Sequence, residues 1–180
     1  MTELNAYTMK EFMAIPDEER ELYKAYGLKS KPADHGTGDI LEWEWAVVKQ
    51  IQDFLNKPYL TYPDMIEMIM LATGKSRDEV MSMKWHEAFK FYNYTVEGIK
   101  RVNELEKQLS YEPDSREVNA GIDRYSDFGW FATLDRLSGG DLLKYDLVGK
   151  QKYCDVFAKL KLNMLDKDFN TRLSKSYQNV

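Results

Sequence analysis

The sequence predicts an all-α fold, because it contains one long amphipathic segment and repeated helix-capping signals. Between Lys84 and Ser110 the apolar residues recur mostly at steps of three and four, which places them on one stripe of a helix. They are Trp85, Ala88, Phe89, Tyr92, Val96, Ile99, Val102, Leu105 and Leu109. At 1.5 Å per residue, this helix would be about 40 Å long, enough to cross a small domain. We expect a bundle of about six to eight helices packed around it.

Residues 1–38 are expected to form an arm and a loop. Thr8 can cap a short helical turn, and Pro16 followed by acidic residues is typical of a helix start. Gly27 is placed to end that helix as a C-terminal cap. The following LKSKPADHGTG has the Gly, Pro and polar residues of a loop. The sequence leaves open whether the arm docks on a neighbouring subunit or folds back on its own core.

The helical domain is expected to span residues 39–180, with a first half at 39–110. Asp39 opens a helix that runs to Asn56. One face of this helix carries Ile40, Trp43, Val47, Ile51, Phe54 and Leu55. At the helical period, Trp45 lies more than about 90° around the helix axis from that face. It is therefore either covered by the arm or exposed as an anchor for a partner protein.

Two capping signals precede the long helix. Thr61 or Tyr62 caps a helix that is apolar almost all round, which predicts burial, and that ends at Gly74. Ser76 and Glu79 form a capping box at the start of a short helix that leads into the long one.

The second half, residues 118–180, contains glycines that interrupt its helical pattern. We expect one helix from about Arg124 to Leu137, ended by Ser138 and the Gly139-Gly140 pair. After a connector, the last helix runs from about Gln151 to Ser174 and is expected to be amphipathic. Its apolar residues are Tyr153, Val156, Phe157, Leu160, Met164, Leu165, Phe169 and Leu173.

Composition argues against nucleic-acid and membrane partners. The 180-residue chain has a formal net charge of −5 and no basic face to displace counterions from phosphates. It contains no run of about 18 apolar residues, so no membrane-spanning helix is expected. Its first residues, MTELNAYTMKEF, lack the basic start and apolar run of a secretory signal.

The sequence offers little catalytic chemistry. HExxH, paired CxxC, GxGxxG and GxxxxGK[ST] motifs are all absent. His35 lies between acidic residues on a glycine-containing loop, and His86 lies one residue from the buried stripe. His35 could serve a small enzyme as a general base and His86 could be a metal ligand, yet each is also an ordinary loop or helix residue. We expect no enzyme, no cofactor and no metal site.

Two stretches resemble the small all-helical proteins of tailed bacteriophages, especially tail-assembly-chaperone-like and other virion-assembly proteins. The first, Ala72 to Ile99, shows the rhythm of a short helix, a cap and a long helix. The second, Asp127 to Phe169, carries an FGWF run, an LSGGD turn and a YDLV connector. The resemblance implies a non-enzymatic protein of the virion or the host cytoplasm. Its expected partners are other virion or assembly proteins and further copies of itself.

The resemblance suggests candidate residues for protein contacts. These are Trp45, Phe128, Trp130, Phe131, Gly139 and Gly140. Phe128 and Phe131 are expected to define an inward face, which would leave Trp130 outward; alternatively, all six residues are core or caps. Two other functions remain open: a cytosolic helical adaptor or regulatory protein, and a small enzyme that uses His35 or His86.

Overall fold

The computed structural model describes residues 6–33, 36–111, 113 and 115–178, and this part of the chain is all-α. It contains ten α-helices, some of only one turn, with short 3-10 helices and no β-strands. The predicted fold class is confirmed. The chain divides into two compact units. Unit 1 comprises Met1–Trp43 and Val47–Arg101, and unit 2 comprises Glu44–Ala46 and Val102–Val180.

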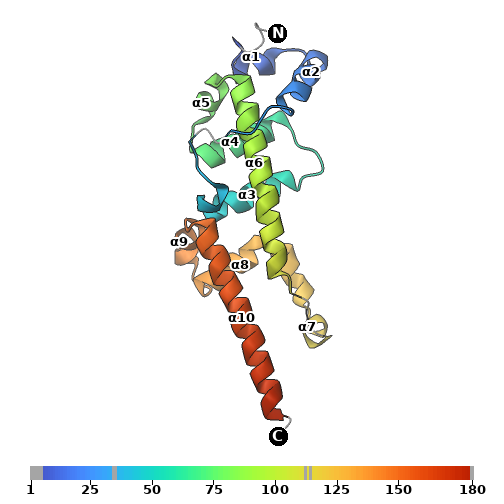
Figure 1. Ribbon diagram of the computed structural model, residues 1–180, viewed down its shortest axis with the longest axis vertical. Coiled ribbons are helices and arrows are strands. Elements are labelled where there is room, and N and C mark those ends of the chain that lie inside the picture. The colour runs from blue at the N-terminus through green and yellow to red at the C-terminus, as the bar shows by residue number, and fades with distance from the viewer. Residues whose placement is uncertain (1–5, 34–35, 112, 114, 179–180) are drawn as a thin grey trace. The chain divides into compact units, whose positions relative to one another are not determined.

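The elements of unit 1 follow the chain order shown in Figure 1. They are α1 (Met9–Ala14), α2 (Asp17–Gly27), the 3-10 helix η2 (Ile40–Glu42), α3 (Trp45–Leu55) from Val47, α4 (Tyr62–Thr73), α5 (Arg77–Ser82) and α6 (Trp85–Glu106) as far as Arg101.

The described part of the N-terminal arm packs on its own chain. Phe12 of α1 is 1% exposed, and its ring stacks on Trp85 of α6 with 5.4 Å between ring centroids. Phe89, one helical turn further along α6, meets the Phe12 ring edge-on, with 5.8 Å between the ring centroids. The Met9 amide donates to the Met83 carbonyl at 2.7 Å. Of the two alternatives for the arm, the structure shows the one in which it folds back on its own core.

Capping boxes start α1, α4 and α5. The sequence predicts the box at α5, whereas for α1 and α4 it predicts only a cap, at Thr8 and at Thr61 or Tyr62. Thr8, Thr61 and Ser76 each accept a hydrogen bond from the third residue of the helix, whose carboxylate bonds back to the capping residue. At α4, Lys57 and Thr61 donate hydrogen bonds to Asp64 and lower the pKa of that carboxyl to about 2. These boxes are local, so residue types three apart are enough to predict them.

Gly27 is not the left-handed cap that the sequence suggests. It belongs to α2 and is not among the glycines of positive φ. A Cβ atom at Gly27 would lie 2.5 Å from Cδ1 of Phe89. Gly27 therefore serves the close approach of α2 to α6 and not the chain reversal after α2.

The prediction of a single helix from Asp39 to Asn56 is wrong. Trp43 is extended (φ −73°, ψ 159°) and separates η2 from α3. The amide of Trp45 then donates to the Gln151 carbonyl at 2.7 Å within unit 2. This break sends two neighbouring tryptophans to different cores: Trp43, 7% exposed, to unit 1, and Trp45, 1% exposed, to unit 2.

The long helix α6 is confirmed, but it is buried on more than the predicted stripe. Phe91 is fully buried, and Thr95 is 1% exposed, although neither lies on that stripe. A Cβ atom at Gly98 would come within 2.9 Å of the Ile40 side chain. Other elements of unit 1 therefore pack on α6 from more than one side.

Unit 2 contains Glu44–Ala46, the end of α6 and the helices that follow it. These are η3 (Lys107–Leu109), α7 (Ser115–Asn119), η4 (Ile122–Phe128), α8 (Trp130–Ser138), η5 (Leu142–Lys144), α9 (Tyr145–Gly149) and α10 (Tyr153–Gln178). The prediction of a continuous helix from Arg124 is wrong, because Gly129 (φ 51°, ψ −134°) divides η4 from α8. The glycine cap after Ser138 is confirmed, with Gly139 at φ 70°.

Candidate functional site

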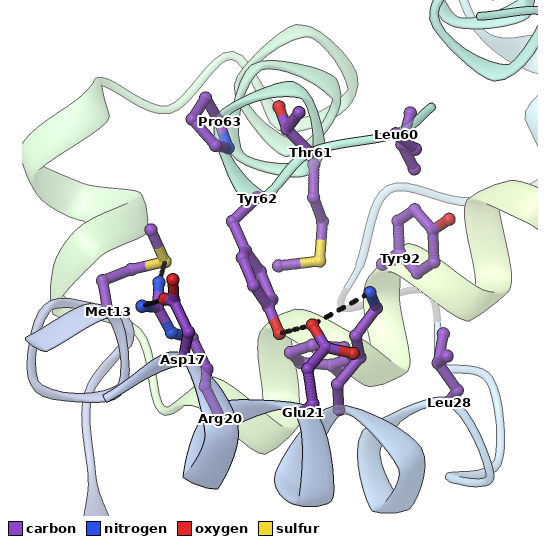
Figure 2. Close-up of a pocket in the computed structure, with 13 residues that line it drawn as sticks. Met13, Asp17, Arg20, Glu21, Leu28, Leu60, Thr61, Tyr62, Pro63 and Tyr92 are labelled. Carbon is purple, nitrogen blue, oxygen red and sulfur yellow. Dashed lines mark hydrogen bonds and ion pairs between the residues drawn. The ribbon is translucent and has the colours of Figure 1, made fainter. Parts of the chain in front are cut away.

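Unit 1 contains a pocket of about 410 Å³ lined by α2, the start of α4 and α6. Figure 2 shows Tyr62 at its centre, with Glu21 and Arg20 of α2 beside it. Leu28 and Tyr92 contribute apolar surface. The pocket therefore combines an apolar lining with one charged side, an arrangement typical of sites for small ligands or anchoring side chains.

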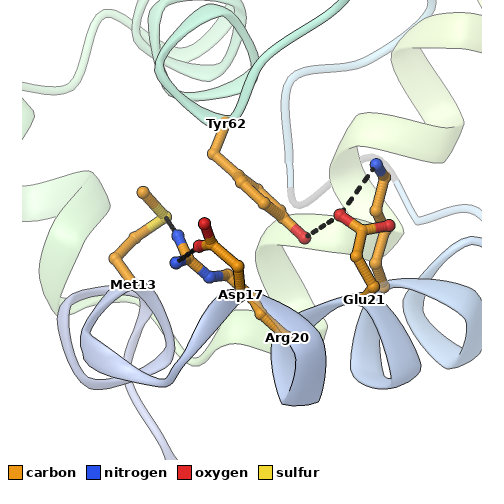
Figure 3. Close-up of polar contacts among 6 residues, drawn as sticks. Met13, Asp17, Arg20, Glu21 and Tyr62 are labelled. Carbon is orange, nitrogen blue, oxygen red and sulfur yellow. Dashed lines mark hydrogen bonds and ion pairs between the residues drawn. The ribbon is translucent and has the colours of Figure 1, made fainter.

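Tyr62 is held by charged groups of α2. The Arg20 guanidinium lies 5.3 Å and the Lys24 ammonium 5.6 Å from the ring centroid, and the hydroxyl donates to Glu21 Oε1 at 3.5 Å (Figure 3). Burial and, secondarily, the Glu21 charge raise the pKa of Tyr62 to about 12. The phenol is therefore protonated near neutral pH and is a poor general base.

The cations of this pocket already have acidic partners. Arg20 pairs with Asp17, and Lys24 pairs with Glu21 at 3.3 Å. Both pairs link residues three apart on α2 and face the solvent in part, so each contributes little to stability. The charged side of the pocket is consequently balanced and provides no strong field for an anion or a cation.

The described candidate histidine, His86, does not line this pocket. His86 is half-buried near the start of α6, edge-on to the ring of Trp85 at 6.3 Å. His35 lies outside the described residues. Within the described part of the chain, no group of three or more His, Cys, Asp or Glu side chains could hold a metal ion.

The predicted contact residues of unit 2 separate into buried and exposed ones. Trp45 is 1% exposed and meets the ring of Trp130 edge-on at 5.5 Å, so it is core in this structure and not an exposed anchor. Trp130 is half-buried and stacks on Phe131 at 4.3 Å. Phe131 is 53% exposed and Phe128 is 65% exposed.

The predicted orientation of these aromatic residues is therefore reversed. The prediction assumed one helix through residues 124–137, with Phe128 and Phe131 inward. Because Gly129 breaks that helix, α8 begins anew at Trp130, which turns toward Trp45 and leaves both phenylalanines outward.

Exposed leucines follow the glycine pair. Gly139 and Gly140 adopt φ values of 70° and 76° and are themselves exposed. Leu142, Leu143 and Leu147 follow and are 73%, 89% and 63% exposed. For this segment the sequence predicts only a connector. The signal for exposed apolar side chains is the adjacent leucine pair in a short linker, where a core position is not expected.

The last helix, α10, carries two apolar stripes instead of one. At about 100° per residue, the stripes lie on nearly opposite sides of the helix. The inward stripe comprises Tyr153, Val156, Phe157, Leu160 and Met164, all buried or half-buried. The outward stripe comprises Leu162, Leu165, Phe169 and Leu173, which are 40–63% exposed. The expectation of one amphipathic face is wrong, because the apolar positions pass from one side of the helix to the other.

Exposed apolar side chains are concentrated in unit 2. Among the large exposed apolar residues of the described chain, Tyr7, Leu28 and Tyr59 belong to unit 1, and all the others belong to unit 2. Large exposed apolar surfaces typically mark sites of protein association. Unit 2 is therefore the candidate protein-contact region, centred on Phe128 and Phe131, on the leucines after Gly140, and on the outward stripe of α10.

Comparisons of the chain with protein-family models, with curated proteins and with solved structures gave no match. Among the described residues, every helix is too short or too polar to span a bilayer.

Proposed function

We propose that this protein is a non-enzymatic component of virion assembly in a tailed bacteriophage, acting through protein–protein contacts of unit 2. The observation that carries the proposal is the exposed apolar surface of that unit, which includes Phe128, Phe131 and Leu143. Fully burying such a side chain from full exposure is worth about 1.5–3 kcal/mol, so covering the exposed part of these residues contributes a fraction of that and favours association.

The phage setting rests on the resemblance of Ala72–Ile99 and Asp127–Phe169 to virion-assembly proteins. The second stretch includes Phe128, Phe131, the glycine pair and the leucines that follow it. The stretch that carries the more particular resemblance is thus also the one with the candidate contact surface. Partners are other virion or assembly proteins, located in the virion or the host cytoplasm.

The experiment is co-expression of the tagged chain with virion proteins encoded in the same genome, followed by affinity purification and mass measurement of the complexes. We expect a complex of fixed stoichiometry that Phe128→Ser and Phe131→Ser weaken at least about tenfold, as for central interface aromatics. Tyr59→Ser is the matched control, because Tyr59 is 85% exposed but belongs to unit 1. Equal losses in all three variants, or no complex with any virion protein, would contradict the proposal.

A further inference from the structure

The outward stripe of α10 is an exposed apolar face. The opposite side of the same helix is held by the rest of unit 2. On that opposite side, the Tyr153 hydroxyl donates to Glu106 Oε1 at 2.9 Å, and Lys167 pairs with Glu117 at 3.0 Å. The last turns of α10 extend beyond the other helices of unit 2 (Figure 1). The orientation of α10 is therefore set from one side, while Leu165 and Phe169, at 54% and 63% exposure, face the solvent on the other.

Charges flank the outward stripe in an ordered way. Lys159 and Lys161 lie beside its N-terminal part, and Asp166 and Asp168 lie beside the part that follows; all four are exposed. At about 100° per residue, Lys159 and Asp166 lie on one edge of the stripe and Lys161 and Asp168 lie on the other. Each edge thus carries a base followed by an acid, and on the second edge the exposed Arg172 comes one turn after Asp168.

We infer that the outward stripe binds the same stripe of a second copy of this chain, with the two helices antiparallel. In an antiparallel pair related by a two-fold axis, each edge meets the same edge of the other copy running in the opposite direction. Lys161 then faces Asp168 of the second copy, and Lys159 faces Asp166. Each contact occurs twice, so the charge pattern of this helix is complementary to itself.

The apolar residues fit the same register. When Lys161 and Asp168 are opposite each other within about one turn, Leu162 lies against Leu165 of the second copy. Ala158, which is exposed, lies against Phe169, so that a small side chain faces a large one. Alternation of small and large residues lets facing helices interdigitate. In a parallel pair, by contrast, Lys161 of one copy would not lie opposite Asp168 of the other copy.

The size of the interface indicates moderate affinity. With about half of each side chain exposed, the stripe and its flanking residues offer about 500 Å² per copy, and a pair buries about 1,000 Å², near the lower limit for a specific interface. Lys161 also donates to Gln108 Oε1 at 3.1 Å, and Asp168 pairs with Arg172 at 2.6 Å, which weakens the contribution of charge. We therefore expect a dissociation constant in the micromolar range, with the apolar stripe as its main source.

This inference rests on the proposed function, because it assigns a second copy as one partner of the same surface of unit 2. The two can fail separately. A monomeric chain that still forms a complex with virion proteins overturns the pairing and leaves the proposed function standing. A dimer that binds no virion protein overturns the proposed function and leaves the pairing standing.

The test is sedimentation equilibrium of the full chain from about 5 to about 200 µM, a range that brackets micromolar affinity. Leu165→Glu and Phe169→Glu are expected to raise the dissociation constant at least about 100-fold, because each places a charge in the apolar contact twice per dimer. Leu143→Glu is the matched control, since Leu143 is 89% exposed in the same unit but lies on η5. Far-ultraviolet circular dichroism verifies that each variant is folded.

A charge exchange tests the orientation without altering apolar residues. Lys161→Asp and Asp168→Lys are each expected to weaken the dimer several-fold, and the double variant K161D/D168K is expected to restore most of the affinity. A wild-type monomer at about 200 µM overturns the inference. So does a dimer or larger assembly that F169E leaves intact, or one in which the double variant is no stronger than the two single variants.

Discussion

The two units use aromatic residues in opposite ways. In unit 1, Phe12, Trp85 and Phe89 form a mutual cluster and are each at most 5% exposed. In unit 2, Trp45 is buried, but Phe128 and Phe131 are mostly outside. The difference shows that unit 1 buries most of its large apolar side chains within the chain, whereas unit 2 leaves many of them exposed to the solvent. The comparison predicts that matched substitutions affect stability in unit 1 and binding in unit 2.

The largest contrast is expected between Phe12→Ala and Phe131→Ala. Phe12 is 1% exposed and touches the rings of Trp85, Tyr62 and Phe89, so its loss should cost about 3–5 kcal/mol of unfolding free energy. Phe131 is 53% exposed, and its loss should cost less than about 1 kcal/mol. Urea denaturation followed by circular dichroism measures both. Equal losses would break the distinction between the units.

Trp45 tests whether unit 2 also has a core of its own. Trp45→Ala should lower the unfolding free energy by about 3–5 kcal/mol, because the side chain is 1% exposed against Trp130. Trp130→Ala should cost less, since that ring is half-buried. Urea denaturation and light scattering are run on the same samples. If Trp45→Ala instead dissolved an assembly without changing the unfolding midpoint, Trp45 would be a contact residue.

Gly27→Ala tests how tightly α2 and α6 pack in unit 1. Helix propensity alone predicts a gain of up to about 1 kcal/mol. The new Cβ atom would lie 2.5 Å from the Phe89 ring, so we expect a loss of about 1–3 kcal/mol instead. Thermal unfolding measures the sign. Combining the change with Phe89→Leu should cost less than the sum of the two single changes, because the smaller side chain relieves the clash.

The smallest effect concerns the capping carboxylate of α4. Hydrogen bonds from Lys57 and Thr61 lower the pKa of Asp64 from 3.8 to about 2. Its contribution to stability is therefore complete above about pH 4 and is lost as the pH falls through about 2. Asp64→Asn should be less stable than wild type at pH 6, and the difference should shrink between pH 4 and pH 2 in urea titrations. A difference independent of pH would show that the charge of Asp64 is not its source.

The fold class and the helix starts followed from local patterns. The stripe of α6 and the capping pairs Thr8–Glu11, Thr61–Asp64 and Ser76–Glu79 depend on residues three or four apart, so the sequence contains all the information needed. The glycine cap at Gly139 is local in the same sense. The breaks at Trp43 and Gly129 could not be predicted in this way, because the helical pattern of apolar residues continues across both positions.

The candidate surface was predictable only in part. The sequence pointed to the segment around Phe128, Phe131 and the glycine pair, but it reversed the orientation of Trp130 and placed Trp45 as a possible exposed anchor. Both errors have the same kind of source, an unpredicted break in a helix, at Trp43 in one case and at Gly129 in the other. Such a break rotates every later side chain relative to the core. The outward stripe of α10 was missed because Leu165, Phe169 and Leu173 were assigned to the same face as the inward stripe.

The sequence by itself therefore determined that this protein is helical, where most of its helices begin, and that one long helix crosses unit 1. Those properties depend on backbone hydrogen bonds and side chains within one or two turns. Only the tertiary structure decided which tryptophan enters which unit, that Gly27 is required by the ring of Phe89, and that unit 2 presents its phenylalanines and the outer face of α10 to the solvent. Those properties depend on contacts between residues far apart in the chain, which the periodicity of a single helix does not contain.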